Sequence, residues 1–331
     1  MLQGIIIRHM NDLSKDAVNW LAVGEDGQGQ RIDNYLVKIL KGVPKSHIYR
    51  ILRSGEVRVN RRKVGPETRL VVGDELRIPP IRATAPGKKP GAEAMGRVAV
   101  PPILFEDDAL IVLDKPAGLA VHGGSGISFG VIERLRHARP EAAFLELVHR
   151  LDRDTSGALV IAKRRSALTG LHAQLRDGAM DKRYFVVVRG KWRDALRTVE
   201  LSLASYVTGA GERRVRVDAA GRLARTVFRR VKLWPKAVPP LALLEAELET
   251  GRTHQIRVHL THLGFPLAGD DKYGDFAWNK ALARQGLKRM FLHAHRIRFA
   301  HPSDGREIVV EAPLAPDLAA FVARLDAAAD A

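Results

Sequence analysis

Residues 147–163, LVHRLDRDTSGALVIAK, place a dense run of charged and hydroxyl side chains between two apolar segments. The flanking segments are rich in aliphatic and β-branched residues, a composition that favours buried strands. A polar loop held between two core strands is a frequent site of function, because the strands fix its position. Asp152 and Asp154 are the carboxylates of this loop, and we expect one of them to carry the chemistry.

Composition narrows the class of protein. With 331 residues and 46% apolar content, the chain can bury one large core or two smaller ones, and 17 prolines and 29 glycines are too few for a disordered or fibrous protein. The absence of cysteine excludes disulfides, thiolate metal sites and a cysteine nucleophile. It also fits a reducing compartment, so we expect a cytoplasmic protein. The N-terminal stretch has only a three-residue apolar run, and nowhere do 18 uncharged apolar residues stand together, so we expect no export segment and no membrane span.

The net charge points to a polyanionic partner. The formal charge is +17, and the sequence pI is about 10.4. Such a charge concentrates nucleic acid around the protein whatever its specific site does. We therefore expect a nucleic-acid partner, with a solubilising surface charge or an anionic membrane face as the alternative interpretations.

The organisation along the chain suggests two domains. Residues 1–30 show no clear period and are interpreted as an N-terminal extension. Residues 31–80 predict two short helices followed by small strands, and they carry twelve Lys or Arg against five acids. Residues 81–100 are rich in Pro, Gly and Ala and predict a flexible linker. Residues 101–331 then predict an α+β domain with a mixed or antiparallel central sheet, including a helix over 251–264.

Three polar residues stand on elements that otherwise look like core: Asp152, Tyr184 in KRYFVVV, and Arg257 in HQIRVH. Each has an ordinary explanation when taken singly, since a buried tyrosine usually packs and a helical arginine is usually exposed. The presence of all three together, however, favours a functional site over three separate structural roles.

The motifs HRLDRDTSG, KRY and GRTHQIRVH together resemble the RluA-type family of ribosomal pseudouridine synthases. The likeness extends to DKPAGLAVHGG and LHAHRIRFAHP, and thus covers residues 101–315. Separately, RIDNYL, PKSHIYRILRSGEVRVN and GDELRIP make residues 31–80 similar to the RNA-binding module named after ribosomal protein S4.

The resemblance implies that the protein converts specific uridines of bacterial large-subunit (23S) rRNA to pseudouridine. It implies Asp152 as nucleophile, Arg257 as its ion-pair partner, Tyr184 as the ring that stacks on the flipped base, and Arg150 as the residue that assists base flipping. It also implies a monomer that needs no cofactor and no metal. In the small module the resemblance suggests five RNA contacts, and the alternative is that these side chains simply form the solvated face of a small domain. The five residues are Lys45, Ser46, Arg50, Arg53 and Arg58.

Three other interpretations fit parts of the sequence. The pair Asp152 and Asp154 is similar to the paired aspartates of magnesium-dependent phosphoryl transferases, but the preceding His149-Arg150 and the position of Thr155 break that pattern. The histidines between 254 and 295 could suggest a metal, although no i, i+4 pair with an acid fits a zinc helix. The third interpretation is a non-catalytic rRNA-binding assembly factor, against which only the set of Asp152, Tyr184 and Arg257 argues.

Overall fold

The computed structural model describes residues 17–40, 43–81, 99–123, 129–209 and 212–330. The chain divides into two compact units, a small one made mainly of residues 1–98 and a large one made mainly of residues 99–331. Most of the expected linker and the first sixteen residues of the expected extension lie outside the described residues. Within the described part, no helix is long and apolar enough to cross a membrane.

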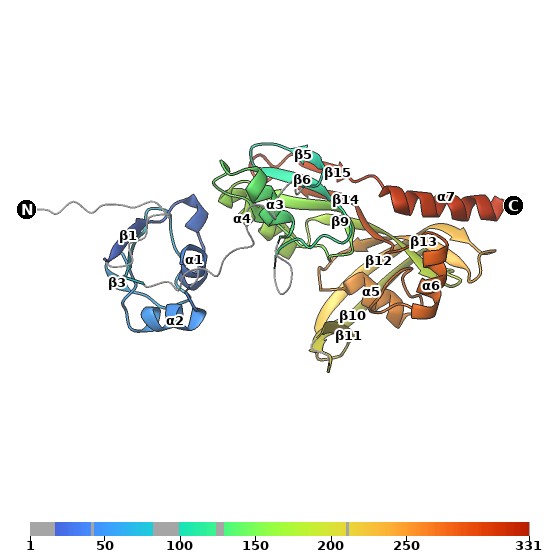
Figure 1. The fold of residues 1–331 in the computed structure, drawn as a ribbon, viewed down its shortest axis with the longest axis horizontal. Coiled ribbons are helices and arrows are strands. Elements are labelled where there is room, and N and C mark those ends of the chain that lie inside the picture. The colour runs from blue at the N-terminus through green and yellow to red at the C-terminus, as the bar shows by residue number, and fades with distance from the viewer. Residues whose placement is uncertain (1–16, 41–42, 82–98, 124–128, 210–211, 331) are drawn as a thin grey trace, which may run out of the picture. The chain divides into compact units, whose positions relative to one another are not determined.

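Among the small unit's described residues, two helices pack against an antiparallel sheet of four strands in the order β1-β4-β2-β3 (Figure 1). Its apolar residues recur at helical spacing, so Ile32, Leu36, Ile48 and Leu52 are all buried in one cluster. The elements are β1 (Asn19–Ala22), a 3-10 turn η1 (Glu25–Gly27), α1 (Ile32–Ile39), α2 (Lys45–Arg53), β2 (Arg58–Val59), β3 (Arg62–Lys63) and β4 (Glu75–Ile78).

The structure corrects the interpretation of residues 1–30 as a loose extension. Strand β1 pairs antiparallel with β4, with Asn19 opposite Ile78 and Ala22 opposite Glu75. Leu21 is buried in the small unit's core. Four residues are too short a run to show a strand period in the sequence, and the strand is defined by its partner instead.

The large unit is built on one mixed sheet of eleven strands, which confirms the predicted α+β class. The main path runs β11-β10-β12-β13-β9-β14-β8-β6-β5, with β15 beside β14 and β7 beside β8. Its pairs are antiparallel except for the parallel contact of β14 with β8. The strands are β5 (Ile103–Glu106), β6 (Leu110–Lys115), β7 (Glu146–Leu147), β8 (Ser156–Ala162), β9 (Asp181–Arg189), β10 (Leu196–Val207), β11 (Arg213–Val217), β12 (Arg222–Trp234), β13 (Leu241–Leu248), β14 (Leu292–Ala300) and β15 (Glu307–Glu311).

In the described part of the large unit, five helices accompany this sheet, among them the long C-terminal helix α7 in red in Figure 1. The helix expected over 251–264 begins only at Gln255, because His254 adopts a left-handed conformation with φ 53° and ends the preceding turn. The helix after Asp275 was not predicted. The helices are α3 (Val131–Ala138), α4 (Arg165–Arg176), α5 (Gln255–His262), α6 (Phe276–Arg284) and α7 (Pro316–Asp330).

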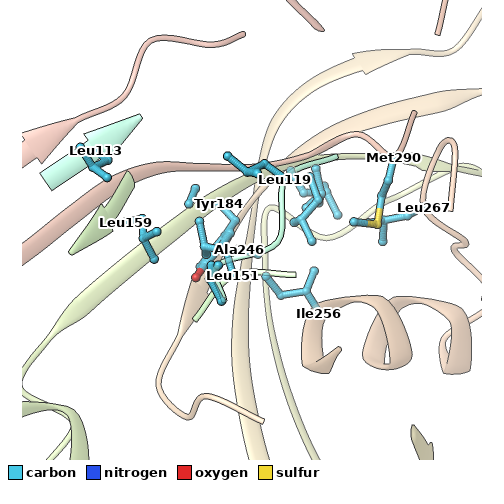
Figure 2. Close-up of a cluster of buried hydrophobic side chains, with 14 of the residues drawn as sticks. Leu113, Leu119, Leu151, Leu159, Tyr184, Ala246, Ile256, Leu267 and Met290 are labelled. Atoms are coloured by element: carbon cyan, nitrogen blue, oxygen red, sulfur yellow. The ribbon is translucent and has the colours of Figure 1, made fainter. Parts of the chain in front are cut away.

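The largest core cluster brings together the segments that the sequence analysis singled out. Leu151, Tyr184 and Ile256 all belong to it, and Figure 2 shows them gathered near Ala246 of β13. All seven residues of β8 are buried. The polar loop that precedes β8 therefore starts from a rigid base, and its neighbours Tyr184 and α5 are fixed by the same core.

Candidate active site

The loop that carries Asp152 is held from both ends. Leu151 is buried in the core, and the backbone N–H of Thr155 donates to the carbonyl of Asp152 at 3.2 Å. His149 has a structural role, since its Nε2 accepts the N–H of Val160 at 3.1 Å. These contacts present the Asp152 carboxylate away from the core, where its side chain is 20% exposed.

A buried lysine fastens the same loop to the start of the large unit. Lys115 Nζ donates to three carbonyl oxygens, those of Leu119 at 2.7 Å, Pro116 at 2.9 Å and Arg153 at 3.0 Å. Burial lowers the pKa of this amine to about 7, with Asp154 and Asp152 opposing the shift. The segment DKPAG and the loop of Asp152 are thus joined through one side chain.

Arg257 is the partner of Asp152, and a second carboxylate shares it. Its Nη1 donates to Asp152 Oδ2 at 3.2 Å, while Nε and Nη2 donate to the two oxygens of Asp270 at 2.7 Å each. Burial by itself would lower the pKa of the Arg257 guanidinium. The hydrogen bonds to Asp270 and the negative charge of that carboxylate outweigh burial and raise the pKa above its ordinary value. Asp152 therefore faces a permanent cation whose plane is set by a bidentate pair.

Asp270 was not among the predicted site residues, although it is one of the most buried acids of the chain, 1% exposed. Burial alone would raise the pKa of its carboxyl, yet the Arg257 guanidinium and two backbone N–H groups hold it below the ordinary value. Those donors belong to Lys272 and Tyr273, at 2.8 and 3.0 Å. The only sequence signal for Asp270 was its place at the start of an acidic turn, DDKYGD. Acidic turns are also common on exposed surfaces, so this pattern does not indicate a buried site residue.

A second chain of polar contacts reaches Asp152, from the Tyr273 hydroxyl through the ring of His254. His254 Nε2 lies 3.7 Å from Asp152 Oδ2, and its Nδ1 lies 2.7 Å from the Tyr273 hydroxyl. That hydroxyl accepts the backbone N–H of Val215 at 2.9 Å, so its own proton is best satisfied by Nδ1. The tautomer that follows carries its proton on Nε2, facing Asp152. Burial lowers the pKa of His254 and favours this neutral form.

Two cavities that share lining residues meet at Asp152. The smaller one, called the inner cavity because both Asp152 and Arg257 line it, has a volume of about 70 Å³; Arg150, Tyr184 and the apolar Leu292 also line it. The outer one, of about 520 Å³, shares Arg150, Asp152 and Tyr184 with it. The structure thus brings the four predicted residues to one place, from three segments far apart in sequence.

Tyr184 is 6% exposed, and burial together with the charge of Asp152 raises the pKa of its hydroxyl. Its ring belongs to the core cluster in Figure 2, and this packing holds the ring in a fixed position on the wall of the cavity. An apolar wall beside a carboxylate and a fixed guanidinium suits a flat, neutral heterocycle attached to a sugar.

Other candidates of the sequence analysis have local partners. Asp154 pairs with Arg153 at 3.3 Å. His259 Nδ1 lies 3.0 Å from the Thr226 hydroxyl, and His293 Nδ1 lies 2.9 Å from the Ser156 hydroxyl. In the described ranges, no group of three or more histidines and acids is arranged to hold a metal ion.

The predicted RNA contacts of the small unit lie on and after α2. Ser46, Arg50, Arg53 and Arg58 are exposed, and Lys45 is the first residue of the helix. Arg50 forms an ion pair with Glu56 at 3.3 Å, while the guanidinium of Arg53 lies over the ring of its neighbour Tyr49. This face is basic and accessible, as expected of an electrostatic contact surface.

Both parts of the chain are similar to known protein families. Residues 109–262 match the family of RNA pseudouridylate synthases, and residues 30–76 match the S4 domain. The chain is 50% identical to "Ribosomal large subunit pseudouridine synthase C" of Haemophilus influenzae, over 93% of this chain and 95% of the relative. The chain belongs to the RNA pseudouridine synthase family. The protein of the same name from Escherichia coli K12 is 50% identical over 90% of this chain and 93% of that relative.

Solved structures support the fold. Human RNA Pseudouridylate Synthase Domain Containing 4 superimposes with a TM-score of 0.55 at 24% identity, covering 71% of this chain and 95% of that one. The sequence matches make the protein an RluA-type RNA pseudouridine synthase with an S4 domain. The matches favour an enzyme over a non-catalytic assembly factor.

Proposed function

We propose that this pseudouridine synthase acts on specific uridines of bacterial large-subunit (23S) rRNA, in the cytoplasm, as a monomer without cofactor or metal. The names of the relatives at 50% identity support the substrate class, since both are ribosomal large-subunit enzymes. The chain's charge of +17 and its S4 domain support an RNA partner.

The observation that carries the proposal is the contact of Asp152 with Arg257 at 3.2 Å beside the ring of Tyr184 in one small cavity. Asp152 acts as the nucleophile or charge-stabilising carboxylate at the ribose. The bond from C1′ to N1 breaks, the uracil rotates, and C1′ joins to C5, whose proton leaves to solvent. Arg257 holds the carboxylate in its attacking orientation, because the guanidinium is itself fixed by Asp270.

Tyr184 and Arg150 receive the flipped nucleotide. Tyr184 offers a rigid ring on which the base stacks, and the exposed Arg150 at the cavity rim takes the space that the base leaves in the RNA. The small unit supplies affinity through Lys45, Ser46, Arg50, Arg53 and Arg58. A tethered module of this kind raises the concentration of RNA at the site without taking part in the chemistry.

The experiment that tests this function uses rRNA labelled with tritium at uridine C5. We expect the protein to release tritium to water in proportion to the pseudouridine formed. Complete retention of the label would overturn the proposed reaction. Mapping pseudouridine in rRNA from cells with and without the gene then identifies the uridines.

A further inference from the structure

The described residues include two buried lysines, which differ in their surroundings. Lys115 is fully buried and donates to three carbonyls. Lys182 is 7% exposed, but its amine makes no hydrogen bond and no ion pair with any described residue. The neighbouring carboxylate, Asp181, is held instead by Arg183 at 3.1 Å.

Lys182 faces the active site. Along β9 the side chains alternate between the two faces of the sheet, so Lys182 shares a face with Tyr184 while Asp181 and Arg183 share the other. Lys182 lines the outer cavity together with Arg150 and Tyr184. It does not belong to the lining of the inner cavity, where Asp152 meets Arg257.

A largely buried ammonium without a counter-ion is unfavourable, because the protein replaces only part of the water that it loses. Burial accordingly lowers the pKa of Lys182, an effect that Asp181 partly offsets. An anion that enters the outer cavity would remove this penalty. The acid on the same wall, Glu249, is already paired with Arg225 at 3.2 Å.

We propose that Lys182 binds a phosphodiester of the RNA strand beside the target uridine. This inference rests on the proposed function. The inner cavity of about 70 Å³ is smaller than a nucleotide, so the strand attached to the reacting nucleoside extends into the outer cavity of about 520 Å³, which shares Arg150, Asp152 and Tyr184 with it. The phosphodiester is the anion of that strand, and the wall it meets also carries Arg150 and Arg176.

The test uses the full chain with Lys182→Met, which keeps the length and removes the charge, and Lys182→Gln as a second neutral variant. We expect KM for an rRNA fragment to rise at least about tenfold, because the variants lose one hydrogen bond to a charged group. The value of kcat should stay nearly unchanged. The slope of log affinity against log salt should fall by about 0.7. Lys182→Arg should retain most of the affinity.

Two controls separate binding from folding. Lys280, exposed on α6, is the matched surface lysine, and Lys280→Met should leave KM and the salt slope unchanged. Lys182→Met should unfold at the same temperature as wild type or higher, because no protein partner is lost. Lys115→Met should unfold at a lower temperature, because three carbonyls lose their donor.

A change in the RNA gives the decisive comparison. Neutral methylphosphonate linkages beside the target uridine should weaken binding to wild type but cause no further loss with Lys182→Met. Equal additional loss in both proteins, or a wild-type KM for both neutral variants, would overturn the inference. A fall in kcat alone would also overturn it, placing Lys182 at the reacting base. Tritium release by wild type is scored separately, so a failure of the proposed function is recognised as such.

Discussion

The two units of this enzyme use charge in opposite ways. In the small unit, Arg50, Arg53 and Arg58 are exposed on and after α2. In the large unit, Arg257 and Asp270 are buried and joined by two bonds of 2.7 Å. Exposed charges act over about a Debye length and are screened by salt, whereas buried pairs act through fixed geometry.

This contrast separates affinity from chemistry. The basic face of the small unit can attract many RNA shapes, since phosphate contacts carry little sequence information. The buried cluster orients one carboxylate toward one cavity. We therefore expect substitutions in the buried cluster of Arg257 and Asp270 to change rate and stability, and substitutions on the basic face of the small unit to change affinity and its salt dependence.

The largest effect is expected from Asp152→Asn. The amide keeps the volume but cannot attack the sugar or stabilise its positive charge, so turnover should fall by about a thousandfold or more. RNA affinity should stay within a few-fold of wild type. Single-turnover tritium release and a binding titration measure the two quantities. Appreciable residual turnover would assign the nucleophile to another residue.

Asp270→Asn tests whether Arg257 depends on its second carboxylate. Removing that charge leaves a buried guanidinium with only Asp152, and breaking a buried pair costs about 3–5 kcal/mol of unfolding free energy. We expect this loss in the denaturant transition of the large unit, together with a lower kcat. Asp271→Asn is the control, since Asp271 is 66% exposed and lies 3.7 Å from Arg257. An unchanged Asp270→Asn variant would contradict the buried-cluster argument.

Stability should also depend on pH through buried histidines of the large unit. Burial lowers the pKa of His259 and His293 from 6.5 to about 4. The unfolded chain therefore binds protons below pH 6.5 that the folded chain does not, so unfolding free energy should fall between pH 6.5 and 4, by up to about 3 kcal/mol for each group.

Denaturant unfolding at a series of pH values measures this loss. In the His293→Gln variant, the slope of unfolding free energy against pH should be smaller over the same interval, by an amount that corresponds to the uptake of up to one proton on unfolding. An identical slope would show that His293 does not contribute. Above pH 7 both proteins should show no histidine contribution, because these groups are neutral in both states.

The smallest effect is expected in the small unit. Arg53→Gln and Arg58→Gln should each weaken RNA binding a few-fold and reduce the salt slope by about 1, with no change in kcat. Both residues are exposed, so unfolding should be unaffected. Arg284→Gln, an exposed residue at the end of α6, serves as the control. A salt slope equal to wild type would remove these arginines from the RNA contact.

The sequence by itself determined the family and the α+β class of the large unit, because hydrophobic period and motif spacing are local properties of the chain. It also predicted four residues that the fold brings together: Arg150, Asp152, Tyr184 and Arg257. It failed at β1, which is too short to have a period, and at the start of α5, where His254 adopts a left-handed conformation.

The tertiary structure decided which polar side chains lie in the core and which partners they meet there. Asp270 and Asp271 are adjacent and chemically identical, yet one side chain is 1% exposed and the other 66%. Lys115 and Lys182 are both buried, but only the first meets three carbonyls. Burial and pairing depend on contacts between distant segments, and for that reason no local pattern in the sequence reveals them.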